Sequence, residues 1–311
     1  MIRRIKLLYV TYNFFQKKKL IHNELLYKKI GLKKRYFSSV SSNDFAHIDP
    51  SLLVNNHNLI DPKDTDLFHE LDDETKAHVL AFDDNGYAVL PNYLTSEEVD
   101  AINEDIEHFL ENGQLKFNEV NKIMFAIKKS ARLKAVANNP KLISFLSSIA
   151  GYHVKLFQSI NFIEGSQQKT HSDSIHMTTF PLGGLLGVWI ALEDIEQDAG
   201  ALHYYPGSHK LPYYLNSDYQ NEGSAFLLGN KGYVAYEKMI EDKIQENQLE
   251  KKVFTAKKGD VLIWHANLLH GGEAHTNKEK TRKSVVFHYF NTTCICYHEI
   301  TQRPALIEQY D

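Results

Sequence analysis

The sequence contains only two cysteines, Cys294 and Cys296, in 311 residues. A single residue separates them in an expected strand, which is too close for a comfortable disulfide between them. A lone Cys-x-Cys without a second pair is also a poor zinc signature. We therefore expect neither a disulfide framework nor a cysteine-based zinc site, and two free thiols indicate a reducing compartment.

Long hydrophobic runs are also missing. No stretch of eighteen apolar residues occurs, so no membrane-spanning helix is expected. The content of hydrophobic residues (43%) and of aromatic residues (12%) is ordinary for a globular protein with one good-sized core. We expect one large domain with an appendage. Nothing in the sequence indicates an oligomeric state.

Acidic residues are almost absent from the first 40 positions, which hold eleven Lys or Arg and the single acid Glu24, a net charge of +10. The whole chain has a net charge of -4, so the remainder carries -14. Residues 1–45 thus form a basic N-terminal extension. It is either a mitochondrial targeting segment, or an amphipathic helix that packs on the domain or touches an anionic surface. The protein is expected to be intracellular, and cytoplasmic if the extension is not a targeting segment. The acidic remainder argues against nucleic acid as a partner.

Residues 46–78 are polar with scattered apolar positions, and we interpret them as a linker or a surface-wrapping arm. The sequence that follows has clear signals for secondary structure, with an Asp-Asn-Gly turn at 84–86 and an apolar strand at 87–90. Thr95, with Glu98 three positions later, forms a capping box that opens an amphipathic helix. In a second helical stretch, Pro140 marks a new start and Gly151 a stop.

After Gly151 the segments are short, rich in β-branched and aromatic residues, and separated by Gly, Asp, Asn or Pro turns. Five of them cover residues 153–165, 185–195, 200–209, 254–270 and 283–293. Many antiparallel strands that follow the helices predict a mainly β sandwich or barrel with flanking helices, of the α+β class.

The stretch "KTHSDSIHM" places His171 and Asp173 two positions apart. In a strand their side chains would point the same way, and imidazole and carboxylate are both good ligands for a divalent first-row metal. An isolated His-x-Asp is more often a hydrogen-bonded pair on a strand surface. A third ligand is needed, and seven later histidines are candidates: His203, His209, His265, His270, His275, His288 and His298.

The later stretch "KKGDVLIWHANLLHGGEAHTNKEKTRKSVVFHYF" strengthens the metal interpretation. Two glycines follow His270, and small residues let a backbone approach a bound group closely. Arg282 and Ser284 share a strand face, where a guanidinium beside a hydroxyl is suited to capturing a small carboxylate. The alternative for Arg282 alone is a surface charge at a strand edge.

Five separated blocks in this order resemble the phytanoyl-CoA dioxygenase family of Fe(II)- and 2-oxoglutarate-dependent oxygenases. They are "FDDNGYAVLPNYLTSEEVDAI", the His171-x-Asp173 segment with "GVWIALEDI", "GALHYYPGSHK", "KKGDVLIWHANLLHGG" and "TRKSVVFHYF". The resemblance covers about residues 79–292. It implies a double-stranded β-helix core, a jelly roll of the cupin kind, within a domain of residues 79–311.

The resemblance also implies roles for individual residues. His171, Asp173 and His270 would bind Fe(II), and Arg282 with Ser284 beside it would bind 2-oxoglutarate, O2 being the other cosubstrate. The segment "FQSINF" is similar to one that touches 2-oxoglutarate in ectoine hydroxylases, which places Gln158 and Asn161 near the keto acid. The expected reaction is hydroxylation of an unactivated C–H bond in a small molecule or acyl derivative, with release of succinate and CO2.

Residues 211–250 form an insertion that is longer and richer in tyrosine than a hairpin requires. We expect a flexible arm followed by a helix from about Tyr236. The insertion is either a lid or recognition loop, with Tyr213, Tyr214 and Tyr219 at the substrate entrance, or a surface helix that covers a barrel edge.

Two other classes of function compete with an oxygenase. A catalytically silent β-helix protein that binds a ligand or partner has no physical reason to keep all four predicted metal and carboxylate ligands. A zinc hydrolase would lack its H-E-x-x-H motif, since "FHELDDE" has no second histidine, and it would not need Arg282. Family resemblance does not identify the substrate.

Overall fold

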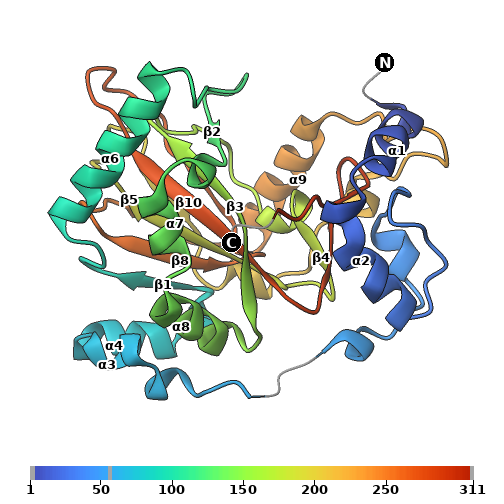
Figure 1. Cartoon of the computed structure of the whole chain (residues 1–311), viewed down its shortest axis with the longest axis horizontal. Coiled ribbons are helices and arrows are strands. Elements are labelled where there is room, and N and C mark those ends of the chain that lie inside the picture. Colours follow the sequence, from blue (N-terminus) through green and yellow to red (C-terminus); the bar gives the residue numbers. More distant parts are fainter. Residues whose placement is uncertain (1–3, 55–57, 309–311) are drawn as a thin grey trace.

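Antiparallel strands build the centre of the molecule, shown in Figure 1 as a computed structural model that describes residues 4–54 and 58–308. The largest sheet has six strands in the order β1-β8-β5-β10-β3-β2. They are β1 (Tyr87–Leu90), β2 (Ile123–Met124), β3 (Val154–Phe162), β5 (Leu185–Ala191), β8 (Val261–His265) and β10 (Ser284–Asn291). The predicted strands at β1, β3, β5, β8 and β10 are confirmed, whereas β2 was not predicted. β5 and β10 are central and almost fully buried; β5 is a continuous apolar run, whereas β10 has His288 among its apolar residues.

Two three-stranded sheets complete the β structure. One has the order β7-β6-β9, built from β7 (Lys252–Phe254), β6 (Leu202–Tyr204) and β9 (His270–Gly272). The other has the order β12-β11-β4, built from β12 (Arg303–Pro304), β11 (Ile295–His298) and β4 (Thr178–Phe180). Side chains of β6 and of the six-stranded sheet share one apolar cluster that includes Phe162, Trp189 and Leu202. Two sheets therefore face each other, and the predicted mainly β fold with a jelly-roll core is confirmed.

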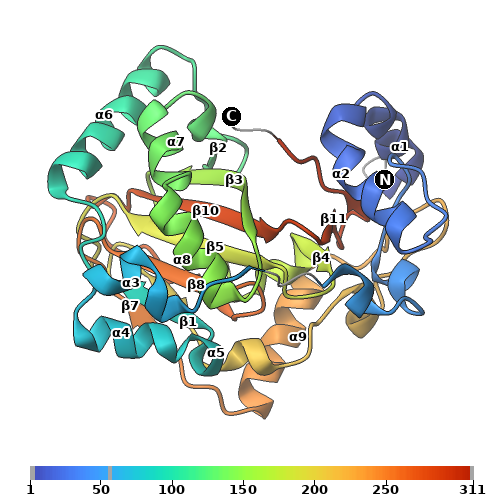
Figure 2. The ribbon, with the colours of Figure 1, turned by 60° about the horizontal axis from the view of Figure 1, so that its bottom comes forward.

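Helices cover the outer face of the six-stranded sheet (Figures 1 and 2). They are α3 (Asp66–Glu70), α4 (Asp73–Leu80), α5 (Phe82–Asn85), α6 (Ser96–Glu111), α7 (Ala131–Ala137) and α8 (Pro140–Ala150). The predicted capping box opens α6, where the Thr95 and Glu98 side chains each accept a hydrogen bond from the other residue's backbone N–H. Gly151, at φ 70°, ends α8 as expected. The end of the polar arm belongs to the core, because Leu67 and Phe68 of α3 are buried in it.

The basic N-terminal extension forms α1 (Lys6–Phe14) and α2 (Lys17–Lys29), which lie beside β11 at the end of the molecule away from α6 (Figure 2). Leu20 and Tyr27 of α2 are buried. The Asn23 side chain donates to the Cys296 carbonyl at 2.6 Å and accepts from its N–H at 2.9 Å. The extension is thus packed on the domain through buried contacts.

The insertion ends in α9 (Tyr233–Glu246), which begins three residues before the expected start. Tyr236 is fully buried and shares an apolar cluster with Ile175, next to the predicted metal ligands. Segment 222–228 is bound to the N-terminal residues, since the Lys6 ammonium donates to the Ser224 carbonyl at 2.6 Å. None of the helices in the described ranges is both long and apolar enough to cross a bilayer.

Candidate metal centre

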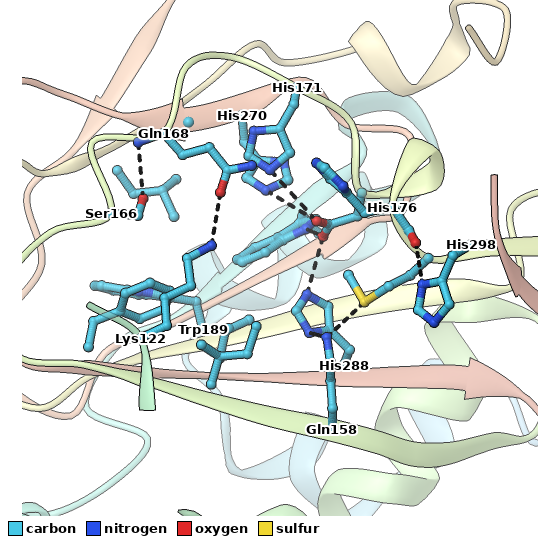
Figure 3. Close-up of a pocket in the computed structure, with 18 of the residues that line it drawn as sticks. Lys122, Gln158, Ser166, Gln168, His171, His176, Trp189, His270, His288 and His298 are labelled. Atoms are coloured by element: carbon cyan, nitrogen blue, oxygen red, sulfur yellow. Dashed lines mark hydrogen bonds and ion pairs between the residues drawn. The ribbon is translucent and has the colours of Figure 1, made fainter. Parts of the chain in front are cut away.

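Three predicted ligands converge on one point. His171 and His270 form an isolated antiparallel bridge, and Asp173 is the first residue of a short 3-10 helix, η6 (Asp173–Ile175). The Asp173 Oδ1 atom lies 3.9 Å from His171 Nε2 and 3.8 Å from His270 Nε2. The side chains of His171 and His270 lie side by side in Figure 3, and the ligand atoms of all three residues lie within 4.8 Å of one another. The assumption of a continuous strand through Asp173 was wrong, because a turn, not strand alternation, brings its carboxylate beside His171.

The hydrogen bonds of both histidines leave the same nitrogen free. His171 Nδ1 lies 2.8 Å from the Lys169 carbonyl, and His270 Nδ1 lies 2.9 Å from the Leu268 carbonyl. A carbonyl only accepts, so each Nδ1 carries the proton and each Nε2 presents a lone pair to the common point. Metal-binding histidines are held in this way by a carbonyl or carboxylate behind them. The two imidazoles are therefore oriented for a metal before one binds.

The carboxylate of Asp173 is oriented from its other side. Trp264 Nε1 donates to Oδ2 at 2.8 Å, and His288 Nε2 lies 3.4 Å from the same oxygen. Oδ1 is left for a metal. Gly187 of β5 makes room for the indole, since a Cβ there would lie 2.2 Å from the Trp264 ring. The sequence analysis did not find Trp264 as a partner of Asp173, because the two lie on separate segments.

Protonation of the triad suits a divalent cation. Burial, assisted by His270, holds the pKa of His171 well below its ordinary value, so the imidazole is neutral. Burial would raise the pKa of Asp173, but the imidazoles of His270 and His288 outweigh it and hold that pKa well below its ordinary value. Two imidazoles and one carboxylate are the donor set of a facial triad. In the described ranges no other group of His, Cys, Asp or Glu side chains converges in this way.

The triad lines a cavity of about 510 Å³. In Figure 3, Lys122 and Trp189 lie to one side of His171 and His270, and His298 lies to the other. We call the first side the arginine end, formed by Lys122, Phe162, Trp189 and Arg282, and the second the C-terminal end, formed by His298, Ile300, Thr301 and Arg303.

Arg282 is a buried cation without a counterion among the residues that the structure describes. Its side chain lies between the rings of Phe162 and Trp189, 5.8 and 5.2 Å from their centroids. Its one hydrogen bond to the described residues is to Ser284 Oγ at 3.3 Å, and its Nε has no partner among them. Burial lowers the guanidinium pKa to about 10. An unpaired buried charge is costly, so this end of the cavity is built to receive an anion.

Lys122 is a second cation at the arginine end, and sequence reasoning missed it. Its ammonium donates to Gln168 Oε1 at 3.1 Å and lies 5.6 Å from the Phe162 ring centroid. Burial lowers its pKa, and no carboxylate of the described residues lies within ion-pair distance of it. Nothing local distinguishes Lys122 from the other Lys and Arg residues of the chain. Only the fold brings it beside Arg282.

The two residues predicted near the keto acid lie on opposite faces of β3. Gln158 lines the cavity, where its amide contacts Met177 Sδ and His288 Nδ1. Asn161 is buried but is not among the lining residues, because an odd number of positions separates it from Gln158 along a regular strand. The contact of Asn161 with a cosubstrate stays a prediction, and its position outside the cavity lining does not support it. Its amide has no partner in the described part of the chain.

The tyrosines predicted at the entrance lie elsewhere. Tyr213, Tyr214 and Tyr219 pack in the apolar cluster of the insertion and do not line the cavity. Tyr233, at the start of α9, does line it, and its hydroxyl is 2.8 Å from His176 Nε2. The insertion thus contributes to the wall through its helix rather than through its arm.

The sequence model of one family, described as phytanoyl-CoA dioxygenase (PhyH), matches residues 82–284, more than half of the chain. The chain belongs to this family. A Danio rerio relative, phytanoyl-CoA dioxygenase domain-containing protein 1, is 28% identical over 183 residues, which cover 56% of this chain and 58% of the relative. A Caenorhabditis elegans homologue of that protein is 23% identical over 237 residues, which cover 70% of this chain and 76% of the homologue. All predicted ligands fall within the family segment.

Two solved structures share the fold of this chain. The carbocyclase SnoK from nogalamycin biosynthesis, described as non-heme and α-ketoglutarate dependent, has a TM-score of 0.61 and 18% identity, over 78% of this chain and 95% of SnoK. EctD from S. alaskensis, solved with 2-oxoglutarate and 5-hydroxyectoine, has a TM-score of 0.57 and 18% identity, over 75% and 83%. At such identity the likeness establishes the fold of this PhyH-family chain.

Proposed function

We propose that the protein is an Fe(II)- and 2-oxoglutarate-dependent oxygenase. The observation that carries the proposal is the unpaired, buried Arg282 in the same cavity as the triad. A metal site alone fits a hydrolase equally well, but an anion-binding arginine beside it does not. Membership of the PhyH family supports the proposal. So do the descriptions of SnoK as α-ketoglutarate dependent and of EctD with bound 2-oxoglutarate.

The residues of the cavity fit both an iron ion and 2-oxoglutarate. His171, Asp173 and His270 would hold the iron on one face and leave its other face open. Arg282 and Ser284 would bind the distal carboxylate of 2-oxoglutarate, and Lys122 would add a second positive charge there. Bound iron and cosubstrate would supply the power to hydroxylate a C–H bond, with release of succinate and CO2.

The protein's own contribution is position. Trp264 fixes the carboxylate of Asp173 so that one oxygen faces the metal. The rings of Phe162 and Trp189 flank the guanidinium of Arg282 and keep water from it, which strengthens its attraction for a carboxylate. We propose hydroxylation rather than halogenation as the outcome. A halogenating enzyme would need a ligand position for a halide, and the carboxylate of Asp173 takes that position.

The test is anaerobic. Fe(II) and then 2-oxoglutarate are added to the purified protein, and the visible charge-transfer band of the chelated keto acid is recorded. We expect a band in the unchanged protein and none in Asp173→Ala or His270→Ala. Arg282→Leu should raise the 2-oxoglutarate concentration for half-maximal absorbance about 10- to 100-fold, since a charge-assisted hydrogen bond to a buried anion contributes about 1.5–3 kcal/mol.

Arg132→Leu is the matched control. Arg132 is exposed on α7 and pairs with Asp105 on the surface, so its loss should leave the band and the cosubstrate affinity unchanged. A folded protein that gives no band would refute the oxygenase and favour a silent binding protein. A hydrolase would bind a metal, yet Arg282→Leu would not change its activity.

A further inference from the structure

The C-terminal end of the cavity lies outside the family segment. His298, Ile300, Thr301 and Arg303 line it, all beyond residue 284, where the family match ends. His298 and Arg303 face each other across the pairing of β11 with β12. The family match therefore does not account for these residues of the cavity wall. Such residues are where selection of the primary substrate is expected.

The charges that line the cavity do not balance. Lys122, Arg282 and Arg303 are positive, and Asp173 is the one carboxylate among the described lining residues. A divalent iron adds two positive charges, and 2-oxoglutarate adds two negative ones. Two positive charges then have no counterpart. If Arg282 engages the cosubstrate, Arg303 is the excess charge at the far end of the cavity.

Arg303 is oriented but not neutralised. Its guanidinium lies 4.5 Å from the ring centroid of Tyr9 on α1, and its Nε donates to Thr301 Oγ1 at 3.1 Å. No carboxylate of residues 4–54 and 58–308 lies within 4.0 Å of it. The stacking and the single hydrogen bond fix the plane of the guanidinium and leave its terminal N–H groups for a planar or tetrahedral anion.

The surroundings of Arg303 add no competing negative charge. His298 Nδ1 donates to the His176 carbonyl at 2.7 Å, and burial lowers the His298 pKa to about 4, so the imidazole is neutral at pH 7. Ile300 and Met177 line the same region with apolar surface. A ligand there would meet one positive charge beside one hydroxyl, and an apolar path toward the triad.

We infer that the primary substrate carries a carboxylate or phosphate that Arg303 binds at the C-terminal end, while the rest of the molecule extends toward the triad. This inference rests on the proposed function for the reaction, but the anion site itself does not require iron. The basic extension takes part in it, because Tyr9 of α1 holds the Arg303 guanidinium in place.

Matched pairs of small ligands test the site by calorimetry. The full-length protein is loaded with Mn(II) and saturating 2-oxoglutarate, so that Arg282 is occupied and no turnover occurs. Butanoate is compared with butanamide, and butyl phosphate with butanol. We expect at least one anion to bind about tenfold more tightly than its neutral partner, and the stronger of the two identifies the anionic group.

The variant Arg303→Gln should reduce binding of the anion to the level of its neutral partner, and Arg303→Lys should retain part of it. Lys257→Gln is the control, because Lys257 is exposed and pairs with Asp194 away from the cavity. Equal binding of charged and neutral ligands would overturn the inference, as would undiminished anion binding in a folded Arg303→Gln protein.

The failure of this inference differs from the failure of the proposed function. A charge-transfer band without a preference for anionic ligands keeps the oxygenase and removes the anion site. Anion binding that depends on Arg303, measured in metal-free protein that gives no band, keeps the site and removes the oxygenase.

Discussion

At the scale of single residues, the orientation of Asp173 depends on Trp264. The indole N–H donates to Oδ2, while Oδ1 faces both ligand histidines. Trp264→Phe removes the donor and keeps most of the ring. We expect Mn(II) or Fe(II) affinity to fall about tenfold or more, as is usual when a partner behind a metal ligand is lost. The Mn(II) affinity is measured by titration with Mn(II), followed by electron paramagnetic resonance.

The control for this prediction is Trp189→Phe. Trp189 Nε1 has no hydrogen-bond partner among the described residues, and its ring contacts Arg282. The Trp189→Phe variant should bind 2-oxoglutarate more weakly and keep its metal affinity unchanged. Unchanged metal affinity in Trp264→Phe would mean that the indole only fills space above Gly187.

Local sequence patterns decide which residues of the site can be predicted from the sequence. His171, Asp173, His270 and Arg282 stand in contiguous blocks whose spacing is informative, and the structure brings them to one cavity. Lys122 and Trp264 carry no such local pattern, because their roles depend on contacts between distant segments. Strand parity alone could have separated Asn161 from Gln158, since residues an odd number apart point to opposite faces.

At the scale of elements, strands and helices with strong local signals were predicted well. β5 and β8 contain continuous apolar runs, β10 is rich in β-branched and aromatic residues, and α6 opens with a complete capping box. The packing of α2 could not be predicted, because a basic and nearly acid-free segment does not indicate its partner. Its buried face contacts β11, a strand about 270 residues later in the chain.

Asn23 is the strongest polar link between these two elements. Both of its hydrogen bonds are to the backbone of Cys296, and the side chain is buried. Asn23→Ala leaves the buried Cys296 N–H unpaired, which costs about 1–3 kcal/mol, and removes one of two hydrogen bonds to the Cys296 carbonyl, which still accepts from the Ala305 N–H. We expect the free energy of unfolding in urea to fall by about 2 kcal/mol or more.

Asn247→Ala is the control for this prediction. Asn247 is exposed at the end of α9, where its side chain donates to the Lys243 carbonyl, and its replacement should change stability by less than about 1 kcal/mol. If Asn23→Ala were no more destabilising than Asn247→Ala, α2 would not be anchored to β11 in solution.

At the scale of the whole molecule, three half-buried histidines couple stability to pH. Burial lowers the pKa of His176, His265 and His298 to about 4. Above pH 6.5 these groups are neutral in both the folded and the unfolded chain, and their contribution to stability is complete. Between pH 6.5 and 4 the unfolded chain takes up protons that the folded chain does not. Stability is therefore lost as the pH falls through this range.

His265 allows this coupling to be measured away from the triad. Its Nδ1 accepts a hydrogen bond from the Asn267 N–H at 3.1 Å, so a proton on that nitrogen would break the bond. Each such histidine contributes up to about 1.4 kcal/mol per pH unit to the slope. In metal-free protein, unfolded by urea between pH 6.5 and 4.5, His265→Gln should flatten the fall in unfolding free energy by about that amount. His78→Gln, at an exposed position on α4, should leave the slope unchanged. Parallel curves for the unchanged protein and His265→Gln would mean that His265 is solvated in solution, and that the chain near the cavity is more open than this fold allows.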